Sequence, residues 1–250
     1  MIWFHGTSSG SIIAVLYALG YTSDEMYKLL KKYTKKIRYV DIDNIFKIII
    51  GLLFTGKIVV EGLNSGDFLI KAMKEVCKEN NIQNINQIKM PIAIPAVSLQ
   101  NGELMVFSSK QVRGEISDGI KYITDIPIDI AVRGSCSYPG VFIPCDYKNM
   151  QLIDGGVRDN TPWKQLKKMG ADSVLGINFA SEIETTSYNE NMIEIVSKAM
   201  KFMEKELVNY ELEGIDKLIT ITTKRVELLD TGKIDYLYKI GYKMAKEQLD

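Results

Sequence analysis

The stretch His5-Gly6-Thr7-Ser8-Ser9-Gly10-Ser11 lies between an apolar run, Met1 to Phe4, and a helix-like apolar stretch, Ile12 to Leu19. This order predicts a strand, a tight turn and a helix. The turn matches the pattern G-x-S-x-G, in which a sharp strand-to-helix turn exposes a serine hydroxyl at the carboxyl end of a sheet. The sequence therefore predicts Ser8 as a candidate nucleophile.

The residues around Ser8 suit that chemistry. Gly6 and Gly10 bound the turn, and glycine fits where a tight turn leaves no room for a Cβ atom. Ser9 begins the predicted helix, so its backbone N–H is a candidate oxyanion donor. An alternative stays open, in which Ser8 only caps the helix. The chain has neither the Gly-Lys-Ser/Thr ending of a phosphate-binding loop nor a G-x-G-x-x-G dinucleotide fingerprint.

A catalytic serine needs a base, and the chain has a single histidine, His5. His5 ends the same strand three residues before Ser8, so the favoured interpretation is a packed or solvated histidine that points away from the hydroxyl. Asp154 is the best-placed carboxylate, because it ends a short apolar strand and precedes Gly155 and Gly156, where a backbone or a substrate can approach closely. On this pattern alone, an aspartate more often belongs to a turn than to a catalytic site.

The composition is that of an ordinary globular chain of 250 residues, 46% hydrophobic and 25% charged, and it predicts a single domain over residues 1–250. Lys plus Arg and Asp plus Glu are both 31, so no net field directs the chain to nucleic acid.

Ile48 to Phe54, the longest near-continuous apolar run, is shorter than the roughly 20 residues of a spanning helix. No signal peptide is visible, and the three cysteines have no metal-ligand spacing. We expect a reducing, cytoplasmic setting.

The rest of the chain alternates predicted helices and strands without a linker or repeat. Thr22, three residues before Glu25, predicts a capping box that starts a helix ending near Lys36. Asn101-Gly102 predicts a two-residue hairpin turn, and Pro95 predicts an edge strand or a bulge. The expected fold is α/β with a mainly parallel sheet. Further helices are expected at 65–78, 128–132, 162–170, 191–211 and 234–249, with short helices within 41–62. Strands are expected at 90–100, 104–107, 151–153, 173–179 and 217–223.

Three blocks of this sequence resemble the patatin-like phospholipases. Gly6 to Gly10 with Ser11-Ile12-Ile13-Ala14 is similar to the nucleophile elbow and helix of that family. The segment from Ala131 to Pro139, followed by Phe142 and Pro144, is similar to its A-x-R-x-S-x-S-x-P block. Asp154-Gly155-Gly156, with Asn160, Pro162 and Gly170 beyond it, is similar to its aspartate block. The blocks follow the family's order and extend from residue 1 to about residue 180.

The resemblance implies a three-layer α/β/α domain with Ser8 and Asp154 at neighbouring strand ends. It implies a lipid acyl hydrolase of phospholipase A or lysophospholipase type, with Ser8 as nucleophile, Asp154 as base and acid, and an acyl-serine intermediate. The implied substrate is a phospholipid or another fatty-acyl ester, with no metal and no organic cofactor. Arg133 either positions an oxygen or a backbone carbonyl near the site or forms a salt bridge. Cys136 is expected to be a small buried filler.

The chain departs from the family at its start. Family members carry a strand and a glycine-rich loop of G-G-G-x-R-G type well ahead of the elbow, and that loop supplies much of the oxyanion hole. Here five residues precede Gly6, so we expect a fold without the family's first strand, either as a piece of a complete enzyme or as a degenerate relative. Two other functions therefore stay open: a catalytically inactive lipid-binding or scaffold protein, and a general carboxylesterase or thioesterase.

Two features bear on peripheral contact with a membrane. A basic face on the helix after Thr22 could touch anionic lipid, although a solvated face is the favoured interpretation; it comprises Lys28, Lys31, Lys32, Lys35, Lys36 and Arg38. Ile48 to Phe54 could form an interfacial lid for lipid tails, although a core helix is favoured. The sequence predicts no oligomeric state.

Overall fold

The structure, a computed structural model of the whole chain, describes residues 2–34, 61–112, 119–181, 192–223, 226 and 230–249. Most of the segment 41–62, including all of Ile48 to Phe54, lies outside the described residues, as do Lys35, Lys36 and Arg38. The chain divides into two compact units, Met1–Ala171 and Asp172–Asp250, and each is described by itself. The expectation of a single domain over residues 1–250 stays a prediction.

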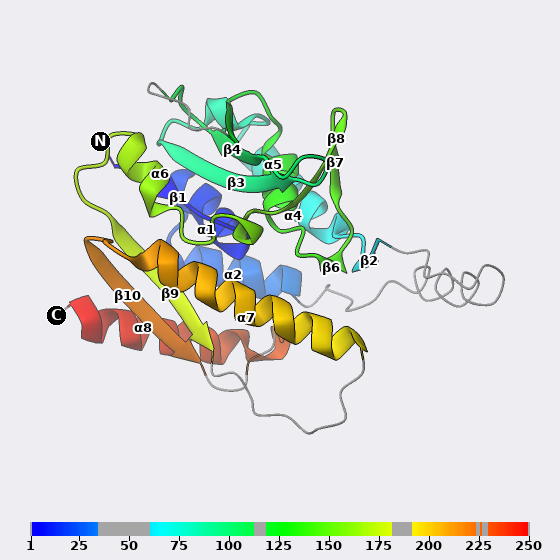
Figure 1. Cartoon of the computed structure of the whole chain (residues 1–250). Coiled ribbons are helices and arrows are strands. Elements are labelled where there is room, and N and C mark those ends of the chain that lie inside the picture. The colour runs from blue at the N-terminus through cyan, green and yellow to red at the C-terminus, as the bar shows by residue number, and fades with distance from the viewer. Residues whose placement is uncertain are drawn as a thin grey trace. The chain divides into compact units, whose positions relative to one another are not determined.

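The first unit is built on a six-stranded sheet (Figure 1). Its strands follow the order β5-β4-β3-β8-β7, and β1 also pairs with β3. Their bounds are β1 Phe4–His5, β3 Ile92–Ser98, β4 Leu104–Ser108, β5 Ile120–Ile123, β7 Cys145–Tyr147 and β8 Met150–Asp154. A separate two-stranded sheet joins β2, Gly62–Asn64, to β6, Gly140–Phe142.

The six-stranded sheet is mixed, so the expectation of a mainly parallel sheet is wrong. β1 and β5 run parallel to their neighbours, whereas the pairs β3–β4, β3–β8 and β7–β8 are antiparallel. The physical reason is that short turns link β3 to β4 and β7 to β8, and strands joined by a short turn pair antiparallel. Gly102, with a φ of 70°, and Lys148, with a φ of 53°, lie in those turns. The predicted hairpin at Asn101-Gly102 is present, with a loop longer than two residues because Ser98 N–H bonds to Glu103 O.

Pro95 lies in the central strand β3, so the expectation of an edge strand is wrong. β4 covers one side of β3 over Ala93 to Val97. The other side is shared, because β1 pairs as far as Ala93 and β8 pairs from Ala96. The backbone C=O of Ala93 faces this shared side, because it accepts a hydrogen bond from Gly6 N–H. Backbone groups of a strand alternate between its two sides, so the nitrogen of Pro95, two residues further along, faces the same side. The proline therefore falls in the gap between β1 and β8, where no ladder bond is lost.

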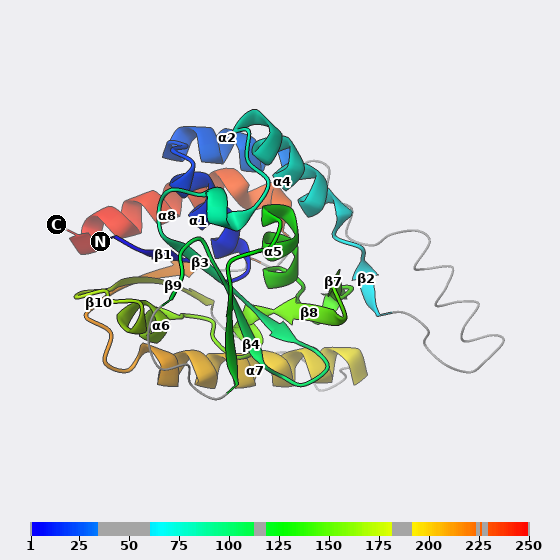
Figure 2. The same cartoon turned by 90° about the horizontal axis from the view of Figure 1, so that it is seen from above.

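Helices cover both faces of this sheet. Figures 1 and 2 show α1, α2, α4 and α5 on one side of β3; their bounds are Ser9–Ala18, Ser23–Thr34, Asp67–Glu79 and Ile128–Ser135. The main core lies between these helices and the alternate residues Ile92, Ile94, Met105 and Phe107. On the opposite face Ala93, Val97, Leu104 and Val106 pack against Met169, which follows α6, Trp163–Lys168. The α/β/α layering is confirmed, and burial on both faces explains why these strands read as continuous apolar runs.

The second unit is a parallel strand pair with two long helices. β9, Leu175–Ser181, pairs with β10, Lys217–Thr223, in a register that sets Leu175 opposite Lys217. Figure 2 shows the pair between α7, Met192–Leu212, and α8, Ile234–Leu249. A strand, a crossover helix and a parallel strand is the expected connection. The sequence predicts these four elements to within a few residues.

Local signals elsewhere are also confirmed. Thr22 N–H donates to Glu25 Oε2 at 2.8 Å and Glu25 N–H donates to Thr22 Oγ1 at 3.3 Å, which is the predicted capping box. The three cysteines are buried free thiols. None of the described helices is both long and apolar enough to cross a bilayer.

Candidate active site

Ser8 occupies a strained turn between β1, which ends at His5, and α1, which begins at Ser9. Its backbone has a φ of 52° and a ψ of −127°, and a positive φ is uncommon for any residue other than glycine. Ser8 is the N-cap residue by position, yet its side chain makes no capping hydrogen bond. The hydroxyl is therefore not used to hold the helix, which argues against the alternative in which Ser8 only caps α1.

The two glycines of the turn differ in what they contribute. A Cβ atom on Gly6 would lie 2.1 Å from Gly10 O, so only glycine fits at position 6. A Cβ atom on Gly10 would meet nothing within 4 Å, so the expectation that this glycine also lacks room is wrong. Their N–H groups are both used, because Gly6 donates to Ala93 O at 3.2 Å and Gly10 donates to Thr7 O at 2.8 Å. Ser9 N–H is one of the first four in α1, which have no acceptor within a helix.

Asp154 is the last residue of β8 and is 2% exposed. Its Oδ1 accepts from Gly156 N–H at 2.8 Å, and its own N–H donates to Ser137 O at 3.1 Å. A Cβ atom on Gly155 would lie 2.5 Å from Pro95 O, and one on Gly156 would lie 2.9 Å from Asn160 Oδ1. Gly155 is therefore required, because its missing Cβ lets the turn after Asp154 approach the β3 backbone closely, as the sequence predicts. At Gly156 the nearest atom is the end of the Asn160 side chain, which can move.

The sheet brings these two turns together. β1 and β8 lie on the same side of β3 and run toward each other, so that His5 pairs with Ala93 and Asp154 with Ala96. Their partners Ala93 and Ala96 are three positions apart on β3, which is roughly 10 Å along the strand. The elbow and the aspartate turn leave the sheet at this gap. The expectation that Ser8 and Asp154 lie at neighbouring strand ends is confirmed.

Further hydrogen bonds link the elbow to the segment after Asp154 and to α5. Thr7 Oγ1 donates to Asp159 O at 3.1 Å, and Ser8 N–H donates to Ser135 Oγ at 3.0 Å. His5 Nδ1 lies 3.0 Å from Pro162 O, which makes Nδ1 the protonated nitrogen of a neutral ring. Burial lowers the pKa of His5 to about 4, and its Nε2 is buried without a hydrogen-bond partner among the described residues. His5 is thus the packed histidine that the sequence favours.

Arg133 supports the site from α5 and is 2% exposed. Its guanidinium donates to two backbone carbonyls, those of Ser65 at 2.6 Å and Ile143 at 2.7 Å, and also to Ser137 Oγ. It lies over the ring of Phe142, 5.6 Å from the centroid. Among the described residues it has no salt-bridge partner. Of the two interpretations, the positioning of backbone carbonyls is therefore the one the structure favours.

Cys136 lies beneath the elbow, with its Sγ 3.8 Å from Ser11 Oγ. Burial, and then the negative charge of Asp154, raise the pKa of its thiol to about 12. A thiol with this pKa stays neutral and cannot act as a nucleophile near pH 7. The expectation of a small buried filler is confirmed.

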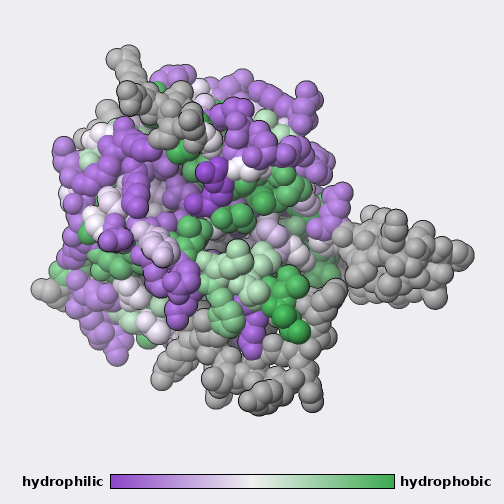
Figure 3. Space-filling model, in the orientation of Figure 1, coloured by the Kyte–Doolittle hydropathy of each residue, from purple (hydrophilic) through white to green (hydrophobic). Residues whose placement is uncertain are grey.

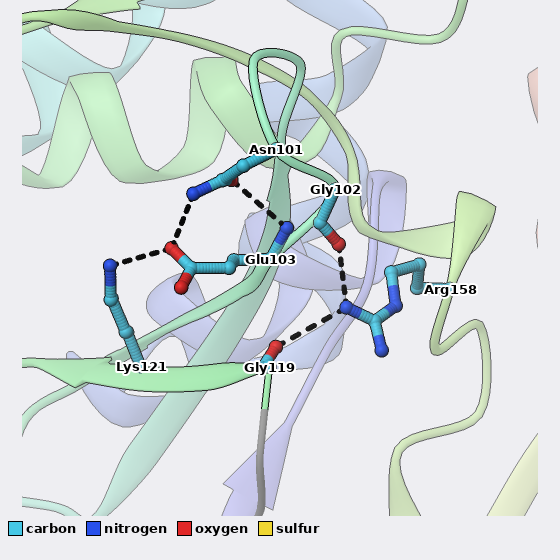
Figure 4. A network of polar contacts seen from close by, with 6 residues as sticks. All are labelled: Asn101, Gly102, Glu103, Gly119, Lys121 and Arg158. Atoms are coloured by element: carbon cyan, nitrogen blue, oxygen red, sulfur yellow. Dashed lines mark hydrogen bonds and ion pairs between the residues drawn. The ribbon is translucent and has the colours of Figure 1, made fainter.

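Arg158 fixes the far end of the aspartate turn. It follows the 3-10 turn Gly155–Val157 and its guanidinium donates to Gly102 O and to Gly119 O, the latter at 3.2 Å. Figure 4 shows these contacts beside Glu103, which accepts from Asn101 and forms an ion pair with Lys121 at 2.6 Å. The hydrogen bond from Lys121 and then that from Asn101 lower the pKa of Glu103. The turn after Asp154 is thereby tied to the β3–β4 hairpin.

Sequence reasoning missed four residues that hold the site together, namely Thr7, Ser11, Ser135 and Ser137. Each acts through a backbone group of the elbow or the aspartate turn, or on Arg133. The alternation of Ser135 and Ser137 around Cys136 was visible in the sequence, but it does not say which serine contacts which strand. That assignment needs the pairing of β1 and β8 with β3.

The comparisons with known proteins identify the family of this chain. A family model described as patatin-like phospholipase matches residues 4–167, which include the elbow, the α5 block and the aspartate turn. The chain belongs to the patatin-like phospholipase family. The matched residues include both the turn at Ser8 and the end of β8 at Asp154.

The individual relatives are each less than 30% identical in sequence to this chain. The chain is 28% identical over 180 residues to the uncharacterized protein YqhO of Bacillus subtilis, covering 70% of this chain and 60% of that protein. It is 29% identical over 162 residues to the probable lipid hydrolase 463L of Invertebrate iridescent virus 6, covering 64% and 51%. It is 24% identical over 194 residues to lysophospholipase NTE1 of Meyerozyma guilliermondii, covering 74% of this chain but 11% of that protein.

The chain thus spans between half and three fifths of the first two of these proteins. A crystal structure of VipD from Legionella pneumophila aligns with 99% of this chain and 61% of its own, with a TM-score of 0.48 and 15% identity. Among the described residues no group of three or more histidine, cysteine, aspartate or glutamate side chains could hold a metal ion.

Proposed function

We propose that the chain is a lipid acyl hydrolase of phospholipase A or lysophospholipase type, with Ser8 as nucleophile and Asp154 as its base. The observation that carries the proposal is the positive φ of Ser8 in the turn from β1 to α1, on the same side of β3 as the end of β8. Membership of the patatin-like phospholipase family supports it. The names of two relatives, a lysophospholipase and a probable lipid hydrolase, indicate the same substrate class.

In the proposed acylation step, the Asp154 carboxylate accepts the proton of Ser8 Oγ while that oxygen attacks the ester carbonyl carbon. The C=O electron pair moves onto oxygen and forms a tetrahedral intermediate. The intermediate collapses as the C–O bond to the alcohol breaks, and Asp154 returns its proton to the leaving oxygen. The product is an acyl-serine at position 8.

In the proposed deacylation step, Asp154 accepts a proton from water, whose oxygen attacks the acyl carbonyl carbon. Collapse of the second tetrahedral intermediate breaks the bond to Ser8 Oγ, and the proton passes from Asp154 to that oxygen. A fatty acid leaves and the enzyme is restored. One carboxyl group therefore serves as base and acid in both halves of the reaction.

The oxyanion donor that we propose is the backbone N–H of Ser9. The N–H groups of Gly6, Ser8 and Gly10 are held by Ala93, Ser135 and Thr7. Ser9 is the first residue of α1, where the helix dipole favours negative charge. Gly6 and Gly10 contribute by shaping the turn that presents this N–H.

An exposed apolar stripe beside the elbow favours a fatty-acyl substrate. Ser9, Ile13 and Tyr17 recur at four-residue spacing along α1 and are exposed, with Ile13 at 42% and Tyr17 at 45%. Phe4 packs on Tyr17, with the ring centroids 4.4 Å apart. Figure 3 shows apolar side chains reaching the described surface among hydrophilic ones. The stripe gives an acyl chain an apolar surface that begins next to Ser8.

Hydrolysis of matched esters tests this proposal. The full chain is assayed on a lysophospholipid, a diacyl phospholipid and a short-chain ester, beside Ser8→Ala and Asp154→Asn, with Ser23→Ala as a control because Ser23 is an exposed serine on α2. We expect release of long-chain fatty acid by wild type and Ser23→Ala, with loss in both site variants. Turnover of short-chain esters alone favours a general carboxylesterase, and binding of lipid vesicles without hydrolysis favours the inactive alternative; either result contradicts the proposal.

A further inference from the structure

Both polar groups of the Ser8 backbone are bound by serine hydroxyls. Ser8 N–H donates to Ser135 Oγ at 3.0 Å, and Ser8 C=O accepts from Ser11 Oγ at 2.6 Å. Ser135 ends α5 and Ser11 lies in the first turn of α1, so two elements hold one residue. Both side chains are fully buried, at 0% exposure. Burial keeps them off a bound substrate and leaves the Ser8 backbone as the group on which they act.

The conformation that these hydroxyls hold is costly. A residue other than glycine in a sparsely populated backbone region costs on the order of 1–3 kcal/mol, and it persists only where its surroundings fix it. Ser8 has a φ of 52°. The close packing of Gly6 on Gly10 allows this turn, but it supplies no acceptor for Ser8 N–H. Ser135 supplies that acceptor.

We propose that Ser135 and Ser11 are positioning residues that hold the nucleophile Ser8 in its strained conformation by binding its N–H and its carbonyl oxygen. The inference rests on the proposed function, since it assigns these residues to the same reaction. Ser135 has the larger effect of the two. Ser8 C=O also accepts from Ser11 N–H at 2.9 Å and keeps that bond without the Ser11 hydroxyl, whereas Ser8 N–H has Ser135 Oγ as its acceptor.

The end of α5 also sets the position of the aspartate. Asp154 N–H donates to Ser137 O, two residues after Ser135. A Cβ atom on Gly134 would lie 2.8 Å from Leu152 Cδ1, so the helix packs closely on β8 at this point. One short segment therefore holds the nucleophile through Ser135 and the aspartate through Ser137. Loss of the Ser135 contact frees the nucleophile while leaving the aspartate in place.

The test compares Ser135→Ala and Ser11→Ala with a matched control, Ser109→Ala. Ser109 Oγ accepts from Ile92 N–H at 2.9 Å and donates to Met90 O at 2.9 Å. Ser109 follows β4 and is buried. Like Ser135, its hydroxyl accepts a hydrogen bond from a backbone N–H, here that of Ile92, the first residue of β3. Two quantities are measured in the full chain: the rate of Ser8 modification by a fluorophosphonate at saturating and at low reagent, and the hydrogen exchange rate of the Ser8 amide.

We expect Ser135→Ala to slow the saturating modification rate by about 10- to 100-fold, the change that follows from leaving one N–H unsatisfied. The reagent concentration for half-saturation stays unchanged, because the reagent does not touch Ser135. Exchange of the Ser8 amide accelerates about tenfold or more once its acceptor is lost. Ser11→Ala gives a smaller change of both. Ser109→Ala lowers the unfolding midpoint but changes neither quantity.

Ser135→Cys is a second variant in case Ser135→Ala folds poorly. It keeps the shape of the side chain but offers only a weak acceptor, so we expect a slow modification rate with near-native stability. Unchanged rate and exchange in both Ser135 variants, or losses no larger than those in Ser109→Ala, would overturn the inference. A wild-type chain that is not modified at Ser8 contradicts the proposed function instead, and the exchange rate of the Ser8 amide still tests the contact.

Discussion

The strained backbone of Ser8 depends on a glycine two residues before it. The 2.1 Å approach that a Gly6 Cβ would make to Gly10 O shows that the two ends of the turn touch. This contact is what allows β1 to pass into α1 over three residues with a positive φ at Ser8. In this chain the first glycine of G-x-S-x-G is required by close packing, whereas the second lies in α1 with room for a side chain.

Gly6→Ala and Gly10→Ala should change stability in opposite directions. At position 6 the added methyl must displace backbone, so we expect a loss of several kcal/mol, at the upper end of what single substitutions cause. At position 10 the methyl has open space in a helix, so we expect a gain of up to about 1 kcal/mol. Urea unfolding of both variants measures the free energies. A tolerated Gly6→Ala would contradict the turn described here.

His5 should make stability depend on pH between 4 and 6.5. Burial lowers its pKa from 6.5 to about 4 in the folded chain. Its contribution is full above pH 6.5 and falls with pH, because the unfolded chain is protonated first. Between pH 7 and pH 5 wild type should lose about 2 kcal/mol more than His5→Gln. Urea unfolding at both values measures the difference, and parallel pH profiles would contradict the buried, neutral histidine.

At the scale of elements, local signals predicted what local chemistry decides. The capping box at Thr22 and Glu25 and the four elements of the second unit could be predicted, because each depends on neighbours in sequence. Pro95 was misread for the opposite reason. Whether a strand proline lies at an edge depends on which strands flank it, and the residues of β1 and β8 that pair with β3 lie 54 or more positions away along the chain.

Thr22→Ala should weaken α2 without affecting the site. The variant removes the hydroxyl that accepts from Glu25 N–H, and loss of an N-terminal cap costs about 1 kcal/mol. The free energy of unfolding measures the loss. Because α2 contains none of the candidate site residues, the rate at which a fluorophosphonate modifies Ser8 should match that of wild type. A site rate that falls with stability would show that the two are coupled, against this expectation.

At the scale of the whole molecule, the sequence proposed Ser8 and Asp154 as a pair but did not predict the sheet that joins their strands. The motif blocks proposed Ser8 and Asp154, and the order of strands sets β1, which precedes Ser8, and β8, which ends at Asp154, on the same side of β3. A strand order is a long-range property that residue patterns do not encode directly. The same limit explains the error over parallel pairing, and it explains why the contacts of Ser11 and Ser135 with Ser8 were missed.

The exposed stripe on α1 should affect long-chain substrates most. Ile13→Asp places a charge on the apolar surface that begins beside Ser9. We expect kcat/KM for a long-chain ester to fall about tenfold or more, which corresponds to the transfer energy of a few methylene groups. Hydrolysis of a short-chain ester, which does not reach Ile13, should change little. Equal losses on both esters would contradict a role of this stripe in binding the acyl chain.

The most direct test of the account is to map the residue that a fluorophosphonate modifies. The full chain is treated with the reagent, digested and analysed by peptide mass, beside Ser8→Ala and Asp154→Asn. We expect one adduct, on the peptide that carries Ser8. It should be absent from Ser8→Ala and form about 100-fold or more slowly in Asp154→Asn, the scale expected for loss of a general base. An adduct on another serine, or an unchanged rate in Asp154→Asn, would contradict it.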